Sequence, residues 1–109
     1  MANSYERIAA VRPTTTDEQD LYPLTSGSII GVIHVCNQDT SARTYRIAIT
    51  DAGTGVAASG EDWLEYDTHI PASTTHKITV EGFKSSGTIR IKASVADKLS
   101  FVFMGVKIT

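Results

Sequence analysis

The chain has 109 residues, of which 41% are hydrophobic and 20% are charged, and its formal net charge is −2. This length and composition predict one globular domain with a sizeable core and exclude global disorder. The small negative charge gives no electrostatic footprint for nucleic acid or anionic lipid, and no apolar run approaches the ~18 residues that cross a membrane.

The first twenty residues are predicted to form an extended arm. Its SYERIAAVR stretch could form a short strand, but the polar PTTTDEQD stretch that follows has no period. The arm lacks the apolar core of a signal peptide, so we expect a protein that is made and folded in a cytoplasm. Three side chains of the arm are candidates for contact with a partner: Tyr5, Arg7 and Arg12.

The LYPLTSG segment comes next, and its Pro23 lacks a backbone donor, which predicts a segment that lies at a sheet edge or leads into one. Residues 28–37 then form the first strong strand. Both of its faces are apolar, which is typical of a central strand covered on both sides: Ile30 and Val32 on one face, and Ile29, Ile33 and Val35 on the other. After the turn QDTSAR, Tyr45 to Thr50 alternates as a half-buried strand.

Residues 51–62 form a Gly-rich loop, and the strand WLEYDTHI follows it. Regular alternation places its side chains on two faces: Leu64, Tyr66 and Ile70 on one, and Trp63, Glu65, Asp67 and His69 on the other. The later stretches HKITVEGF, TIRIKASV and LSFVFMGVKIT also read as strands, and the last is apolar on both faces.

No window shows a helical period, and strands recur every 8–12 residues or so. The pattern predicts an all-β domain over residues 21–109: an antiparallel β-sandwich or a jelly-roll-like barrel of six to eight strands, behind the N-terminal arm of residues 1–20. Because a small domain has few fully covered strands, some outward side chains of the last strand are expected to contact a partner subunit: Val102, Met104 and Val106.

His34 and Cys36 lie two residues apart and therefore project from the same strand face. A Cys–His nucleophile would need an oxyanion hole and an orienting group, and a zinc site would need further ligands that His69 and His76 do not supply at a fitting spacing. We therefore expect Cys36 to be buried in the core, and we predict no catalytic residue, no metal and no cofactor. A single Cys forms no internal disulfide.

The surface formed by Trp63, Glu65, Asp67 and His69 is the candidate for ligand binding. An exposed Trp beside carboxylates could stack on a sugar, but side chains two apart on a flat strand form no catalytic cleft. A buried Trp, or one at a subunit interface, is the favoured interpretation.

Charge is distributed unevenly along the chain. Residues 1–67 hold ten acidic and four basic side chains, whereas residues 68–109 hold two acidic and six basic ones. This indicates either two differently solvated faces, which we favour, or opposite patches that meet between identical subunits.

Two segments resemble a family of small phage virion proteins. One is VCNQDTSARTYRIAIT, in which an apolar strand ends in V-C-N and resumes after a polar loop. The other runs from WLEYD to LSFVFMGVKI and carries Y-D before a polar turn, an I-R-I-K-A-S strand and L-S-F before a late Gly. With the LYPLTSG lead-in, the resemblance covers residues 21–108.

The resemblance implies a non-enzymatic structural protein of the virion. Such proteins are similar to head decoration (cement) proteins, which bind the outer capsid surface and stabilise it, or to small tail- or fibre-associated modules that bind a receptor or glycan. It implies as partners the chain itself, as a homotrimer, and the major capsid protein or another virion protein. It implies no enzyme activity, and it leaves the position on the virion open.

Overall fold

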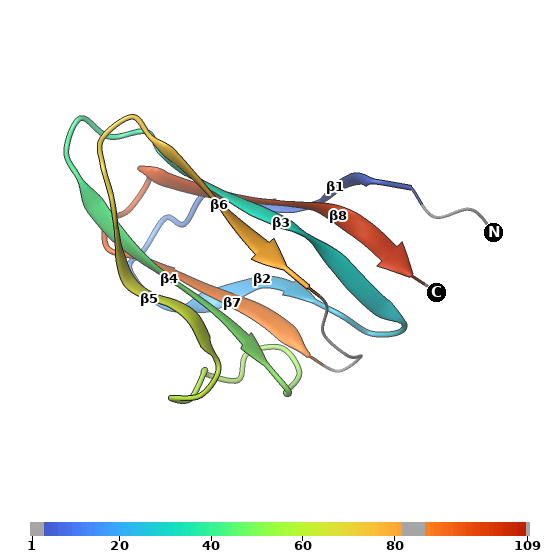
Figure 1. The fold of residues 1–109 in the computed structure, drawn as a ribbon. Coiled ribbons are helices and arrows are strands. Elements are labelled where there is room, and N and C mark those ends of the chain that lie inside the picture. Colours follow the sequence, from blue (N-terminus) through green and yellow to red (C-terminus); the bar gives the residue numbers. More distant parts are fainter. Residues whose placement is uncertain (1–3, 82–86, 109) are drawn as a thin grey trace.

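The computed structural model describes residues 4–81 and 87–108, which form eight antiparallel strands in two four-stranded sheets (Figure 1). Sheet A has the order β1-β8-β3-β6 and sheet B the order β2-β7-β4-β5. The strands are β1 (Glu6–Val11), β2 (Gln19–Pro23), β3 (Ser28–Asn37), β4 (Arg43–Thr50), β5 (Trp63–Ile70), β6 (Thr75–Val80), β7 (Thr88–Ala93) and β8 (Leu99–Ile108).

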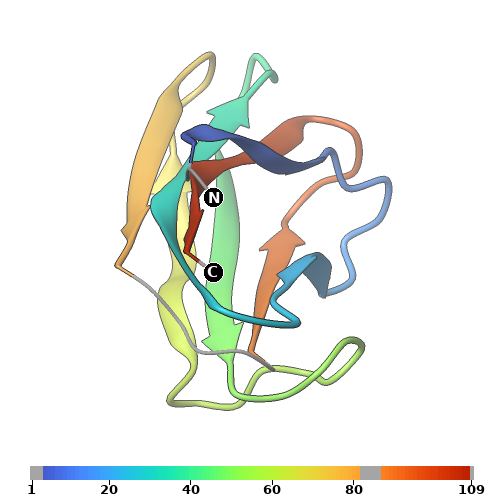
Figure 2. The same cartoon turned by 90° about the vertical axis from the view of Figure 1, so that its right-hand side faces the viewer.

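The two sheets pack face to face, so the chain is a β-sandwich and not a closed barrel. This confirms the all-β prediction and decides between its two alternatives. Figure 2 shows β5 and β6, which lie in different sheets, on the same side of the molecule. No helix within the described ranges is long and apolar enough to cross a membrane.

The core lies between the sheets and is formed by the side chains that point inward at every second position of each strand. The strands β3 and β8 form the centre of sheet A and pair over ten positions, from Ser28 opposite Ile108 to Asn37 opposite Leu99. Every second side chain of each strand points inward. Phe101 contacts Tyr45 across the sandwich, with ring centroids 6.3 Å apart. The largest fully buried side chains are Tyr45, Phe101, Phe103, Leu24, Ile29, Ile33, Ile47, Ile70, Ile89, Ile91, Leu99 and Val35.

Part of the predicted N-terminal arm is the short strand that its SYERIAAVR stretch allowed, and this strand is built into the sandwich. Residues 6–11 form β1, which pairs with β8 at the edge of sheet A, from Glu6 opposite Gly105 to Val11 opposite Phe101. Ile8, Ala9 and Val11 pack against the core. This part of the arm is therefore a strand of the sandwich, because its few apolar side chains find a place beside β8. The LYPLTSG prediction was correct: β2 is an edge strand of sheet B.

The predicted faces of β5 are also wrong. Its pairing with β4 shifts register twice, once between Tyr45 and Ile47 and once between Ile47 and Ala48. Each shift inserts an extra residue into β5 and so breaks the alternation. Asp67 adopts φ 50°, a left-handed conformation that Asp tolerates better than most residues. As a result Leu64 and Tyr66 are exposed although Ile70, predicted to share their face, is buried, and Glu65 is partly buried.

The two central strands of sheet A come unusually close at Gly31 and Gly105, which face each other in the ladder. A Cβ on Gly31 would overlap the backbone oxygen of Met104, and one on Gly105 would overlap that of Ile30. Glycine is required at both positions because of this close backbone approach, not because of an unusual φ angle.

Asn37 joins two loops at one end of the sandwich. It is 1% exposed, and its Nδ2 donates to the backbone oxygens of Ser41, Ile70 and Pro71 at 3.0, 3.2 and 3.2 Å. Its Oδ1 accepts a hydrogen bond from the backbone N–H of Asp39 at 2.9 Å. The side chain thus fixes the β3–β4 loop to the end of β5, which gives the V-C-N block of the sequence a structural role.

Candidate functional site: the outer face of sheet A

The outward side chains of β3 and β8 form a continuous apolar strip on the outer face of sheet A. They lie in register as cross-strand neighbours, with Val32 opposite Met104 and Ile30 opposite Val106. Ile30 is 44% exposed. Tyr5, which precedes β1, lies beside these side chains. We call the whole set the apolar face; its members are Tyr5, Ile30, Val32, Val102, Met104 and Val106.

Tyr5 lies between two shallow depressions on the apolar face. One, of about 380 Å³, is lined by Ile30, Val32 and Val106 together with the end of β6. The other, of about 450 Å³, is lined by His34, Cys36, Thr75, Val102 and Met104. Tyr5 contributes to both and is 59% exposed. An exposed aromatic ring between two apolar hollows is typical of a protein-binding surface.

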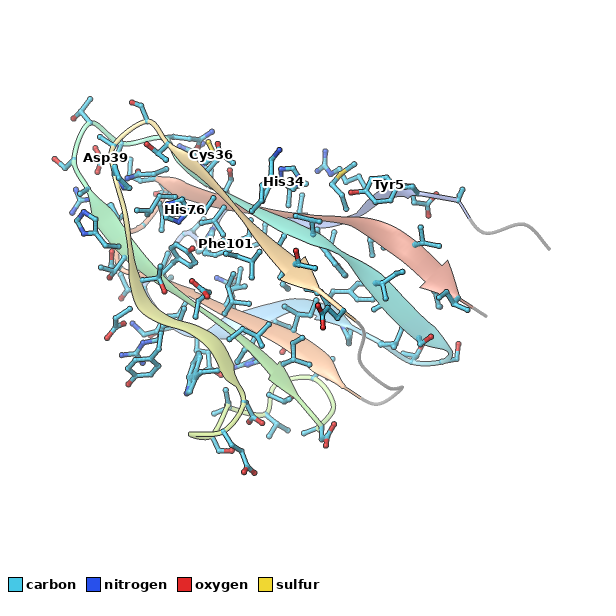
Figure 3. All side chains as sticks on the ribbon, in the orientation of Figure 1. Tyr5, His34, Cys36, Asp39, His76 and Phe101 are labelled. Atoms are coloured by element: carbon cyan, nitrogen blue, oxygen red, sulfur yellow. The ribbon has the colours of Figure 1, made fainter. Side chains whose placement is uncertain are left out.

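His34 and Cys36 lie on the outer face of sheet A, beside the apolar face, and not in the core. Figure 3 shows both side chains on the side of sheet A that faces away from sheet B, whereas Phe101 and His76 lie between the sheets. Cys36 is partly exposed, so the expectation that it is buried was wrong. The expectation that the two share a face was correct. Only Val35 of the H-V-C stretch is a core residue, at 0% exposure.

The two arginines predicted for partner contact differ in their surroundings. Arg7 lies opposite Met104 on the edge strand β1 and is exposed. Arg12 donates from Nε, at 3.0 Å, and from Nη2 to the backbone oxygen of Asp97. The guanidinium of Arg12 therefore holds the β7–β8 turn against the end of β1.

The Trp63 surface lies on sheet B and is organised by a residue that the sequence did not single out. Arg46 of β4 lies over the ring of Tyr66 at 3.9 Å and over Trp63 at 5.6 Å, and the two rings meet edge to face. Its Nε and Nη2 donate to the two carboxylate oxygens of Asp67, at 2.7 and 3.1 Å. This bond lowers the pKa of Asp67 below its ordinary value. The T-Y-R-I-A alternation, which puts Arg46 on the outer face, was the available signal.

Glu65 is not part of that surface. It accepts a hydrogen bond from the hydroxyl of Thr68 at 3.0 Å and lies close to Tyr45. Burial, and then the nearby Glu65 carboxylate, raise the pKa of Tyr45 to about 12. The Tyr45 hydroxyl is also 3.0 Å from Nδ1 of His76 on β6, so these polar groups join the two sheets at one side of the core.

The outer face of sheet B carries paired charges. Arg90 is buried and binds Glu18 at 2.8 Å and Asp20 at 2.6 Å. These ion pairs join the acidic first part of the chain to its basic last part within one molecule. The charge imbalance along the sequence is thus partly compensated internally.

The described residues do not form a metal site. No group of three or more His, Cys, Asp and Glu side chains within residues 4–81 and 87–108 could hold a metal ion.

No family model matches the chain, and no curated protein matches it. Among solved structures, it is similar to a chain from the acidic stable capsid structure of Helicobacter pylori bacteriophage KHP30, with a TM-score of 0.48 and 10% identity over 100% of this chain and 89% of that chain. A likeness this distant does not assign the chain to a family.

Proposed function

We propose that the protein is a non-enzymatic structural component of a phage virion. In this proposal it is a capsid decoration protein that self-associates, as a trimer, and binds the outside of the head together with the major capsid protein. The virion assignment is supported by the sequence blocks V-C-N, T-Y-R-I-A, Y-D and L-S-F. The self-association is supported by the geometry of the sandwich.

The observation that carries the self-association is the contrast between the two outer faces. Sheet B presents charges that are paired within the chain, as in Arg90 with Glu18 and Arg46 with Asp67. Its exposed Leu64 and Tyr66 lie on the edge strand β5, and Arg46 lies over the ring of Tyr66. Sheet A presents aliphatic side chains and Tyr5 around two apolar depressions. A face of charged groups that already have partners remains in water at little cost, whereas covering an apolar face stabilises a complex by roughly 25 cal/mol per Å².

Most of the residues predicted to contact a partner subunit lie on or beside the apolar face, but the contact is not made by a free arm. Val102, Met104, Val106 and Tyr5 lie on the apolar face, and Arg7 lies beside it. Residues 6–11 are a strand of sheet A, so this part of the chain is held in the sandwich and is not a free arm that orders on a lattice. The proposed contact is therefore a surface and not a tail.

The experiment compares two substitutions of matched exposure on opposite sheets. Ile30 on β3 and Leu64 on β5 are both 44% exposed. Wild-type protein and the Leu64→Thr variant should form trimers by light scattering, co-sediment with heads assembled without this protein, and raise the temperature of genome release. The Ile30→Thr variant should lose trimers and bind heads at least tenfold more weakly, because several subunits no longer engage at once. Equal behaviour of the two variants would contradict the proposal.

A tail- or fibre-associated binding module is the second candidate. It is supported by the depression of about 630 Å³ on sheet B, lined by Glu18, Arg46, Ala58, Gly60, Trp63 and Tyr66, which offers aromatic and charged groups together. The same sedimentation experiment separates the two. Protein that stays in the supernatant with heads but binds host cells or their polysaccharide, and loses that binding in Trp63→Ala, would favour adhesion.

A further inference from the structure

Of the four edge strands that the described residues form, three are shaped against pairing with another strand. Each shows a shift of register against its neighbour: β1 between Arg7 and Ala9, β2 between Asp20 and Tyr22, and β5 at two positions. β2 also ends in Pro23. Bulges and prolines at an edge disturb the row of free backbone groups, and proteins use them to prevent edge-to-edge association.

The fourth edge strand, β6, has none of these features. It pairs with β3 without a shift from Gly31 opposite Val80 to Cys36 opposite Thr75. It contains no proline, and Thr75, Lys77 and Thr79 are exposed along its outer face. Its other edge pairs with no strand in the part of the chain that the structure describes. A regular and open edge of this kind can accept a further strand.

We propose that Lys77–Glu81 pairs with the same segment of a second copy, antiparallel and across a two-fold axis at Thr79. The segment K-I-T-V-E is complementary to itself in this register. Lys77 lies opposite Glu81 of the second copy, Ile78 lies opposite Val80, and the two Thr79 side chains face each other. Opposite charges, aliphatic pairs and Thr–Thr pairs are each favourable between facing strands.

Other registers are less favourable. Residues directly opposite must share a face, so the axis has to pass through a residue and not between two. An axis at Lys77 would place two lysines directly opposite each other, which is destabilising. An axis at Ile78 would place Lys77 opposite Thr79 and Glu81 opposite Thr75, without any charge pair. A lysine on an edge usually discourages pairing, but here Glu81 supplies the opposite charge.

The end of β6 also adjoins the apolar face. Thr79, Val80 and Glu81 line the depression of about 380 Å³ together with Ile30 and Val106. Pairing of two β6 strands would join two copies of sheet A into one eight-stranded sheet and would cover Ile78, which is only partly buried in one copy. This contact is isologous and requires neither a capsid nor a trimer.

A pair of cysteine variants in a Cys36→Ser background tests the register. Thr79→Cys and Thr75→Cys replace the same residue type on the same exposed face of β6. In the proposed dimer the two residues 79 are directly opposite each other, whereas the two residues 75 are eight positions apart, or roughly 27 Å. Mild oxidation should link Thr79→Cys into a dimer at least tenfold faster than Thr75→Cys. Equal rates, or no dimer from Thr79→Cys, would overturn the proposal.

A charge exchange tests the same contact without new thiols. Lys77→Glu and Glu81→Lys should each weaken the dimer, measured by sedimentation equilibrium, by roughly three- to thirtyfold, since each dimer contains two such pairs. The double variant Lys77→Glu/Glu81→Lys should restore the original affinity. All four proteins should also be measured with Ile30→Thr, which removes the proposed association through the apolar face. Failure of the double variant to recover in this background would refute edge pairing and leave the decoration proposal standing.

Discussion

Replacement of Asn37 by Asp should destabilise the protein more than replacement by Ala, although Asp is the closer mimic in shape. The amide nitrogen of Asn37 faces three backbone oxygens at 3.0–3.2 Å. In Asn37→Asp a carboxylate oxygen occupies the place of the donor and faces those three oxygens in a buried site. In Asn37→Ala the same oxygens and the N–H of Asp39 lose their partner, but no charge is introduced.

The magnitude follows from the number of bonds. The amide has two hydrogens to donate, and its oxygen accepts one bond, so about three net hydrogen bonds at ~1 kcal/mol each give a loss of about 3 kcal/mol for Asn37→Ala. A buried charge without a partner typically costs 3–5 kcal/mol, so Asn37→Asp should lose about 4 kcal/mol or more. At roughly 4–8 °C per kcal/mol, Asn37→Ala should lower Tm by about 12–24 °C.

Urea unfolding at pH 7, followed by circular dichroism, measures both variants. Gln38→Glu is the matched control, because the same amide-to-carboxylate change at the exposed neighbouring position should alter stability by less than about 0.5 kcal/mol. If Asn37→Asp were milder than Asn37→Ala, the side chain would act by filling space, and the assignment of its amide as the donor that ties the two loops would be wrong.

Three further outcomes are expected. Gly105→Ala should lower the free energy of unfolding, measured in urea, by about 1–3 kcal/mol, because its Cβ would overlap the backbone of β3. Gly53→Ala has nothing within 4 Å of the new Cβ and should be nearly neutral, so equal effects of the two variants would contradict the close approach of β3 and β8. The pKa of Asp39 lies below its ordinary value of 3.8, chiefly because Arg43 donates a hydrogen bond to it. Its contribution to the free energy of unfolding is therefore complete above that value and is lost as pH falls below it. Asp39→Asn should reduce this loss of stability at acid pH, and an unchanged pH dependence would refute the assignment. A thiol reagent should label Cys36 in the folded monomer and more slowly in the proposed assembly; equal rates would show that the apolar face stays open.

Most of the fold could be predicted because strand identity depends on a local property, the alternation of apolar side chains. The strands at Ser28–Asn37 and Trp63–Ile70 have the predicted bounds. The faces of β5 could not be predicted, because a bulge arises from pairing with β4 and leaves no local mark other than Asp67, a residue that tolerates φ 50°.

The apolar face shows a second feature that could not be predicted from the alternation of apolar side chains, namely which molecule covers a given strand face. Apolar residues on both faces of β3 indicated a strand covered on both sides. Sheet B covers one face, and within the described chain the other carries partly exposed side chains such as Val32. Sequence alone cannot tell a face that the same chain covers from one that is left for another molecule. Arg46 was missed for a similar reason, because its contact with Trp63 depends on which strands are neighbours.

Sheet A carries both proposed contacts, and the two differ in symmetry. An edge contact in which Thr79 faces its own copy closes at two molecules, whereas a contact through the apolar face can close a ring of three. Neither alone covers an extended surface. Two contacts of different symmetry on one molecule can link trimers into a continuous layer, and such a layer would bind a capsid through many weak contacts at once. The edge proposal therefore gives the decoration proposal a means of stabilising a particle that a single bound trimer would lack.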